Sequence, residues 1–183
     1  METDRIAATR TPPAPIGVEV EISDTQSHLT LDRRALADLV RRALAAEGVD
    51  HASISLAVVD DPTIRAINAR HLGHDRATDV ISFGLSEPGE PGLAGELVVS
   101  AETAARTSRA AGVDPFAELA LYVVHGLLHL CGHDDTHAEA AAAMRRREGE
   151  VLAAVGLINT YPLVGTDGPP ADDAGRESVR WPR

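Results

Sequence analysis

The chain has 183 residues, enough for one domain of ordinary size, and 44% of them are apolar, so it can bury a sizeable core. The formal net charge of −11 argues against a protein that grips nucleic acid through a general basic surface, because Lys and Arg must neutralise phosphates in that mode of binding. The single cysteine, Cys131, excludes an internal disulfide and favours a reducing compartment.

Membrane and secretion signals are not found in the sequence. No apolar run approaches the ~18 residues that span a bilayer, and the N-terminus lacks the apolar region of a signal peptide. We therefore expect a cytoplasmic protein with no membrane and no DNA among its partners. Nothing in the sequence indicates an oligomeric state.

Strand and helix patterns alternate along the chain. Alternating apolar residues predict strands at 16–22, 54–58, 78–83 and 95–99, and a Pro- and Gly-rich loop follows at 86–92. Capping residues and apolar stripes predict helices that begin after Asp32, Asp60, Ser100 and Asp114, and a last helix over 136–155. This alternation predicts an α/β or α+β fold: a single domain with a mixed sheet of about four strands packed with helices. We expect the domain to span 15–159, between disordered tails at 1–14 and 160–183.

The most informative stretch runs from Val123 to His137 and holds four of the eight histidines. His125 and His129 stand four residues apart in an apolar run that predicts a central, buried helix, so the two imidazoles share one face. Gly132 and the polar residues after it can fold back towards the rings. Two imidazoles and one further ligand are typical of a catalytic zinc site, which keeps one position open.

Spacing alone does not choose the third ligand, for which the candidates are His133, Asp134, Asp135 and His137. A competing interpretation makes His125 and His129 two core histidines that are satisfied by hydrogen bonds to the backbone or to each other. We disfavour that interpretation, since a buried polar pair is costly unless its partners are in place.

Gly126 separates this pattern from the H-E-x-x-H metalloproteases, in which the residue after the first histidine is the general base. Glycine cannot take a proton, so peptide hydrolysis by that mechanism is disfavoured. The missing side chain leaves room for a neighbouring strand or a bulky substrate to approach the helix.

These residues resemble a known family. H-G-L-L-H-L-C-G-H-D at 125–134 is similar to the H-G-x-L-H-L-x-G-Y-D-H motif of the YbeY family, bacterial metal-dependent endoribonucleases implicated in ribosomal RNA maturation. A second motif, L-N-x-x-Y-R-x-x-D-x-P-T-D-V-L-S-F, is similar to the stretch that holds Ile67-Asn68, Asp75 and the residues 78–83. The family pattern also matches at Gly95-Glu96-Leu97 and at Met144. The similarity covers roughly residues 16–155.

The resemblance implies a zinc-dependent endoribonuclease that cleaves single-stranded RNA. It implies one Zn²⁺ per chain, ribosomal RNA and the ribosomal subunit as partners, and roles in 16S 3′-end processing and ribosome quality control. The catalytic histidines would then be His125 and His129, which act through the metal. The sequence offers no obvious general base.

The family's third zinc histidine comes six residues after the second, and Asp135 occupies that position here. The simplest transfer of the metal ligands is therefore His125, His129 and Asp135, because aspartate is a legitimate zinc ligand. His137 and His133 remain alternatives for the third ligand. A carboxylate in place of a neutral imidazole lowers the net charge of the centre by one.

Leu72 is the second departure, because the family has there an arginine thought to serve the active site. Arg76, in the following loop, is better placed to substitute for it than Arg70, so Arg76 is a candidate catalytic residue. Candidate substrate-binding residues, which could equally be hydrogen-bonded structure, are Thr78, Asp79 and Ser82.

Two other function classes remain open. The acidic surface and Leu72 also fit a ribosome assembly factor with a structural metal and little catalysis. The His-x-x-x-His spacing also fits a small zinc metallohydrolase or protease, against which Gly126 counts.

Overall fold

The computed structural model describes residues 17–87 and 91–157, so the tails expected at 1–14 and 160–183 lie outside the described residues. Within these ranges the chain forms four strands and five helices. In chain order they are β1 (Gly17–Asp24), α1 (Arg33–Ala46), β2 (His51–Val59), α2 (Asp61–Leu72), β3 (Val80–Gly84), β4 (Leu93–Ser100), α3 (Ala101–Ala111), α4 (Pro115–Leu130) and α5 (Ala138–Ala154).

The strands form one mixed sheet in the order β1-β2-β4-β3. β2 pairs in parallel with both β1 and β4, and β3 pairs antiparallel with β4. The predicted fold class is therefore confirmed: an α/β arrangement with a four-stranded mixed sheet.

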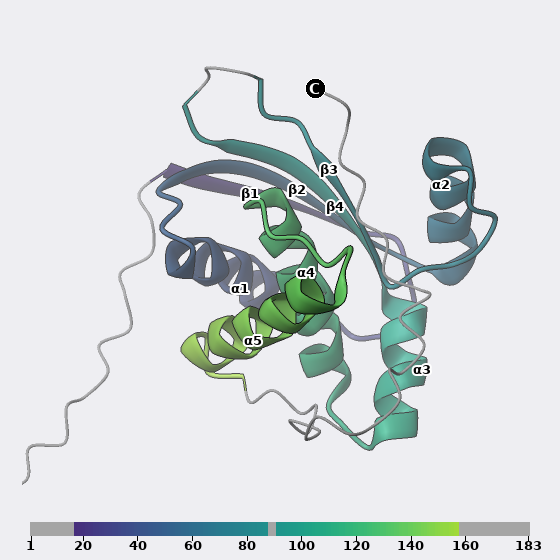
Figure 1. Cartoon of the computed structure of the whole chain (residues 1–183). Helices are drawn as coiled ribbons and strands as arrows, with labels where there is room; N and C mark the ends of the chain where they lie inside the picture. The colour runs from purple at the N-terminus through teal and green to yellow at the C-terminus, as the bar shows by residue number, and fades with distance from the viewer. Residues whose placement is uncertain (1–16, 88–90, 158–183) are drawn as a thin grey trace, which may run out of the picture.

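Helices cover both faces of the sheet, and successive residues of a strand point to opposite faces, so neighbours in sequence belong to different apolar clusters. Val80 and Leu97 belong to the main core, together with buried residues of α1, α4 and α5. Ile81 and Val98, their neighbours in sequence, belong to a smaller cluster with Ile64 of α2. Figure 1 shows α1, α4 and α5 gathered on one side of the sheet. α2 therefore packs on the opposite face.

α4 is the central helix, and every residue from Glu118 to Leu128 is buried. Two glycines let it approach the sheet closely. A Cβ at Gly126 would lie 2.7 Å from Leu97 Cδ2, and one at Gly95 would lie 2.5 Å from Leu130 Cδ1. The space expected at Gly126 is thus filled by the sheet. Despite its apolar character, neither α4 nor another helix of the described segments has the length and apolarity to cross a bilayer.

Asp114 starts α4 as an N-cap: its Oδ2 accepts a hydrogen bond of 3.0 Å from the Ala117 N–H. Asp114→Ala removes this acceptor, and we expect the free energy of unfolding to fall by about 1 kcal/mol. Asp114→Asn keeps an acceptor and should stay close to wild type. Urea unfolding followed by circular dichroism measures both variants. An equal loss in both would assign the effect to the charge at the helix terminus rather than to the hydrogen bond.

Two elements are shorter than expected because side chains compete for backbone groups. β3 begins at Val80 instead of residue 78, and Asp79 Oδ1 accepts a hydrogen bond of 2.9 Å from the Val80 N–H. The last helix begins at Ala138, after His137 in the N-cap position. β2 and β4 extend beyond their expected ends, while the expected first residue of β1, Ile16, lies outside the described residues.

Candidate metal centre

Two imidazoles and one carboxylate converge near the C-terminal end of α4. His125 and His129, about one helical turn apart, place their Nε2 atoms 2.9 Å from each other. Each oxygen of the Asp135 carboxylate lies 3.6 Å from one of these Nε2 atoms. All three groups offer ligand atoms within 4.8 Å of one another. The structure therefore brings together a group that can hold a metal ion.

The centre is buried on its helical side and reaches solvent beside the carboxylate. The side chains of His125 and His129 are 3% and 7% exposed, whereas that of Asp135 is 15% exposed. Asp135 is therefore the most exposed of the three groups.

The outer nitrogens of both rings are hydrogen-bonded. His125 Nδ1 lies 2.6 Å from Glu148 Oε1 of α5. His129 Nδ1 lies 3.1 Å from the backbone carbonyl oxygen of His133. A carbonyl oxygen only accepts, so His129 Nδ1 donates, and in the neutral ring Nε2 keeps its lone pair for the centre.

The loop after α4 turns back towards the rings, as expected from Gly132. The φ of Gly132 is 98°, in the left-handed region that glycine tolerates. Asp134 then organises the loop, because its Oδ1 accepts hydrogen bonds from the N–H groups of Asp135 at 2.8 Å and Thr136 at 3.1 Å. This turn directs the Asp135 side chain to the histidines.

The Asp135 carboxyl is prepared to bind a cation. The His129 ring beside it, and to a lesser degree His125, holds the pKa of Asp135 below its usual value, although partial burial opposes the shift. The group is therefore a carboxylate at neutral pH, with a negative charge beside two nitrogen donors.

The two alternative ligands have other partners. His133 Nε2 lies 2.8 Å from Glu47 Oε2, and Glu47 Oε1 accepts a hydrogen bond of 2.7 Å from Arg147 Nε. His137 Nδ1 accepts a hydrogen bond of 3.2 Å from the Ala140 N–H at the start of α5. Neither His133 nor His137 belongs to the group formed by the other three side chains.

Cys131, although close to His129 in sequence, is not a member of the group. Its side chain packs against the main core. Burial, with a smaller contribution from Glu47, raises the pKa of the Cys131 thiol to about 11. A protonated, partly buried thiol is typical of a small core residue.

The donor set fits zinc. Zinc–ligand distances of about 2.0–2.1 Å in a tetrahedron place ligand atoms roughly 3.3 Å apart. The observed separations of 2.9, 3.6 and 3.6 Å bracket that value. Two nitrogens and one oxygen also leave the fourth position open, as in catalytic zinc sites.

Comparison with known proteins assigns the chain to a family. The family model described as "Endoribonuclease YbeY" matches residues 21–156. The chain belongs to the YbeY family of endoribonucleases. An endoribonuclease YbeY from Anaeromyxobacter dehalogenans is 40% identical over 141 residues, which cover 76% of this chain and 72% of that protein.

Other relatives differ in how much of their length is matched. An endoribonuclease YbeY from Rhodopirellula baltica is 45% identical over 128 residues, 68% of this chain and 65% of that protein, so just under two thirds of its length is spanned. A solution structure of a Thermotoga maritima protein covers 74% of this chain and 90% of its own, with a TM-score of 0.50 and 23% identity. This last likeness concerns the fold alone.

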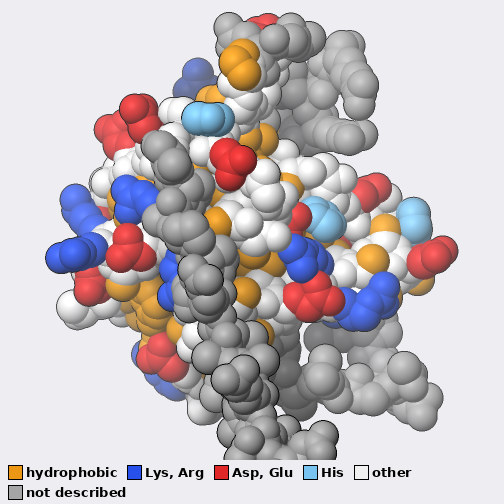
Figure 2. Space-filling model, turned by 90° about the vertical axis from the view of Figure 1, so that its left-hand side faces the viewer, with side chains coloured by type: hydrophobic (Ala, Val, Ile, Leu, Met, Phe, Trp, Pro, Cys, Tyr) orange, Lys and Arg blue, Asp and Glu red, His pale blue; other side chains and the backbone are white. Residues whose placement is uncertain are grey.

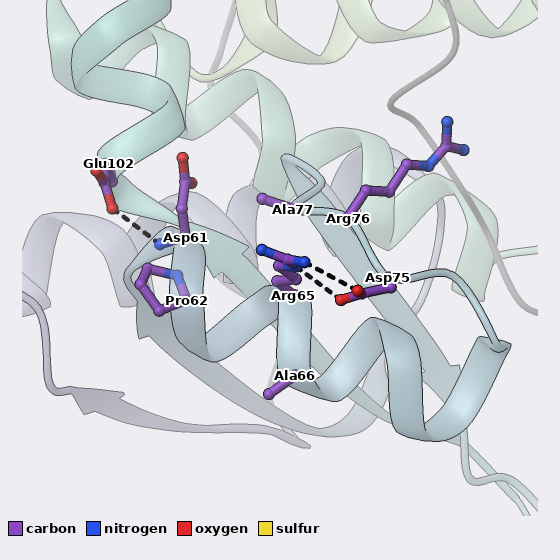
Figure 3. Close-up of a pocket in the computed structure, with 8 residues that line it drawn as sticks. All are labelled: Asp61, Pro62, Arg65, Ala66, Asp75, Arg76, Ala77 and Glu102. Carbon is purple, nitrogen blue, oxygen red and sulfur yellow. Dashed lines mark hydrogen bonds and ion pairs between the residues drawn. The ribbon is translucent and has the colours of Figure 1, made fainter.

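At the position of the YbeY arginine, Leu72 ends α2 and packs against the smaller apolar cluster. Arg76, the proposed substitute, is exposed and lines a pocket of about 810 Å³ between α2 and α3. In Figure 3 its side chain extends away from the Arg65–Asp75 ion pair in the same pocket. None of the three residues of the metal-binding group lines this pocket. Arg76 is thus placed at this pocket, and its role in the site stays a prediction.

Thr78, Asp79 and Ser82, the three candidate substrate-binding residues, are 3%, 8% and 3% exposed. The Thr78 hydroxyl lies 3.2 Å from Asp79 Oδ1, and the Asp79 carbonyl oxygen accepts a hydrogen bond from the Ser100 N–H. Ser82 lies two residues beyond Val80 and so points to the α4 face of the sheet. Ser82 is thus on the same side of the sheet as the metal-binding group.

Glu148 was missed in the sequence. It is 4% exposed and lies in α5 on the same buried face as Met144. A carboxylate in an apolar stripe is the signal that could have revealed it, because Glu is rarely buried without a partner. That partner, His125, becomes evident only when α4 and α5 pack together.

Proposed function

We propose that the chain is a zinc-dependent endoribonuclease that cleaves single-stranded RNA and acts in ribosomal RNA maturation. Its proposed substrates and partners are the 3′ end of 16S RNA and the ribosomal subunit, with a role in ribosome quality control in the cytoplasm. The observation that carries the proposal is the convergence of His125, His129 and Asp135, in a chain of an endoribonuclease family.

In the proposed mechanism, the metal ion and the protein side chains have different roles. A bound zinc ion would act as a Lewis acid that withdraws charge from the scissile phosphate. His125 and His129 would hold the ion through Nε2, and their Nδ1 hydrogen bonds fix the ring orientations. Asp135 is the third ligand in this proposal. Its carboxylate makes the centre less positive than one with three imidazoles.

RNA contacts must be local. On the face shown in Figure 2, carboxylates are interspersed with arginines. We propose that Ser82 contacts the substrate, because it points to the α4 side of the sheet. We propose the same role for Thr78 and Asp79, which precede the same strand. Arg76 would bind an RNA phosphate at the α2–α3 pocket, supported by its exposed position there.

The test is cleavage of a 16S-type RNA with a single-stranded 3′ extension by zinc-loaded protein. We expect one zinc per chain and loss of cleavage when the metal is removed with a chelator. His129→Ala should lower the rate at least ~100-fold, because metal ions contribute several kcal/mol to such reactions.

The matched control is His51→Ala, which removes an exposed histidine at the start of β2. This variant should bind zinc and cleave RNA as wild type does. Full activity in metal-free protein, or in His129→Ala, would exclude the proposed mechanism.

A ribosome assembly factor with a structural metal is the second candidate. It is favoured by Leu72, which packs in an apolar cluster where the YbeY pattern has an arginine. A folded His125→Ala variant that still supports ribosome maturation in cells would favour this candidate over the enzyme. The protease alternative has less support, because Gly126 is packed against Val80 and Leu97 and offers no base.

A further inference from the structure

Glu148 is the buried acid in contact with the candidate metal centre. Its Oε1 atom lies 2.6 Å from His125 Nδ1, a short contact of the kind that a charged hydrogen-bond partner favours. Both side chains are nearly inaccessible, at 5% and 3% exposure. Removing a carboxylate from water is costly, so its position beside this ring needs a compensating role.

The chemistry of the contact dictates the tautomer of His125. A carboxylate has only acceptors, so the ring must carry its proton on Nδ1. In the neutral ring, Nε2 then keeps its lone pair and faces His129 Nε2 at 2.9 Å. Two nitrogen lone pairs and the Asp135 carboxylate gathered at such distances can all bind one cation.

The two histidines differ in how this orientation is achieved. His129 donates to a backbone carbonyl, which side-chain substitution does not delete. His125 depends on a side chain from another helix, 23 residues further along the chain. Glu148 is therefore the group through which substitution can change the tautomer of one ligand and leave the ligand itself in place.

We propose that Glu148 is a positioning residue of the metal centre. It accepts the Nδ1 proton of His125, fixes the ring plane and directs the Nε2 lone pair at the metal. This inference rests on the metal centre proposed above. Partners of this kind typically contribute about 10–100-fold to metal affinity.

Metal affinity is the first test, measured as competition for zinc between the full chain and a chromogenic chelator. Glu148→Leu, which keeps the volume but not the acceptor, should weaken zinc binding ~10–100-fold. Glu148→Gln can still accept through Oε1 and should retain more affinity than Glu148→Leu. Glu139→Gln is the matched control, because it removes an exposed carboxylate from the same helix and should bind as wild type does.

The second test is the tautomer itself, read from ¹⁵N shifts of the histidine rings in metal-free wild-type protein. His125 should carry its proton on Nδ1, and Glu148→Leu should shift the population towards the Nε2–H form. This reading does not depend on whether a variant folds, because the wild-type spectrum alone overturns the proposal if His125 is protonated on Nε2.

The outcomes separate the two proposals. Wild-type protein without zinc affinity would reject the proposed function. Tight zinc binding by wild type and equally tight binding by a folded Glu148→Leu variant would leave the metal centre intact and reject the role of Glu148.

Discussion

Asp135→Ala is expected to weaken zinc binding by at least ~100-fold, because a direct ligand contributes more than the outer partners, whose loss costs about 10–100-fold. The structure gives the reason for choosing this residue: each carboxylate oxygen lies 3.6 Å from one of the two Nε2 atoms. Isothermal titration with zinc and metal analysis of the purified variant measure the effect. RNA cleavage should fall in parallel.

The controls are the two histidines that compete with Asp135 in sequence. His137→Ala removes an N-cap of α5 and should lower stability by about 1 kcal/mol, with zinc affinity close to wild type. His133→Ala removes the contact with Glu47 but keeps the backbone carbonyl that His129 uses. A larger loss of affinity in either control than in Asp135→Ala would identify that histidine as the ligand instead.

Asp135→His provides the rescue, because it restores the histidine of the YbeY pattern. The variant should bind zinc far more tightly than Asp135→Ala, since imidazole is an equally legitimate zinc ligand. Its failure to do so would show that the loop geometry accepts a carboxylate but not a ring.

Gly126→Ala is expected to lower the free energy of unfolding by about 1–2 kcal/mol. The new methyl would meet Leu97 Cδ2 at 2.7 Å and Val80 Cγ2 at 3.0 Å, in a fully packed region. Overpacking costs about 1–3 kcal/mol, and the better helix propensity of alanine offsets at most about 1 kcal/mol of it. Urea unfolding of metal-free protein gives the difference without a contribution from zinc.

The matched background for this test is Leu97→Val, which withdraws the methyl group nearest to the new side chain. The double variant should be more stable than the sum of the two single effects predicts, because the substitutions relieve each other's packing errors. Additive losses would mean that the contact with Leu97 does not cause the effect.

Local sequence signals were sufficient to predict α4 and the positions of its two histidines. Apolar character on almost every face predicts a buried helix, and spacing of four residues places His125 and His129 on one face. Asp114 and Gly132 mark where the helix begins and where the chain turns back. These features depend only on neighbouring residues, so the sequence alone is enough to find them.

The rest of the site depends on contacts between distant segments. Spacing left four candidates for the third ligand, because the turn at Asp134 directs Asp135 to the centre, whereas His133 contacts Glu47 at the C-cap of α1. The contact of Glu148 with the site could not be predicted from the sequence, because its partner lies in another helix. The strand order β1-β2-β4-β3 likewise has no local signature, since β3 precedes β4 in the chain but occupies the edge of the sheet.

The hydrogen bond between His129 and the His133 carbonyl has a consequence for mutational tolerance. The group in use belongs to the main chain, so the side chain at position 133 is free to vary as far as the metal centre is concerned. This accounts for a histidine here where the YbeY pattern has a tyrosine. The constraint falls instead on Gly132, whose φ of 98° a residue with a Cβ rarely adopts. Substitution at 133 should therefore leave the metal centre in place, while substitution at 132 should displace a ligand.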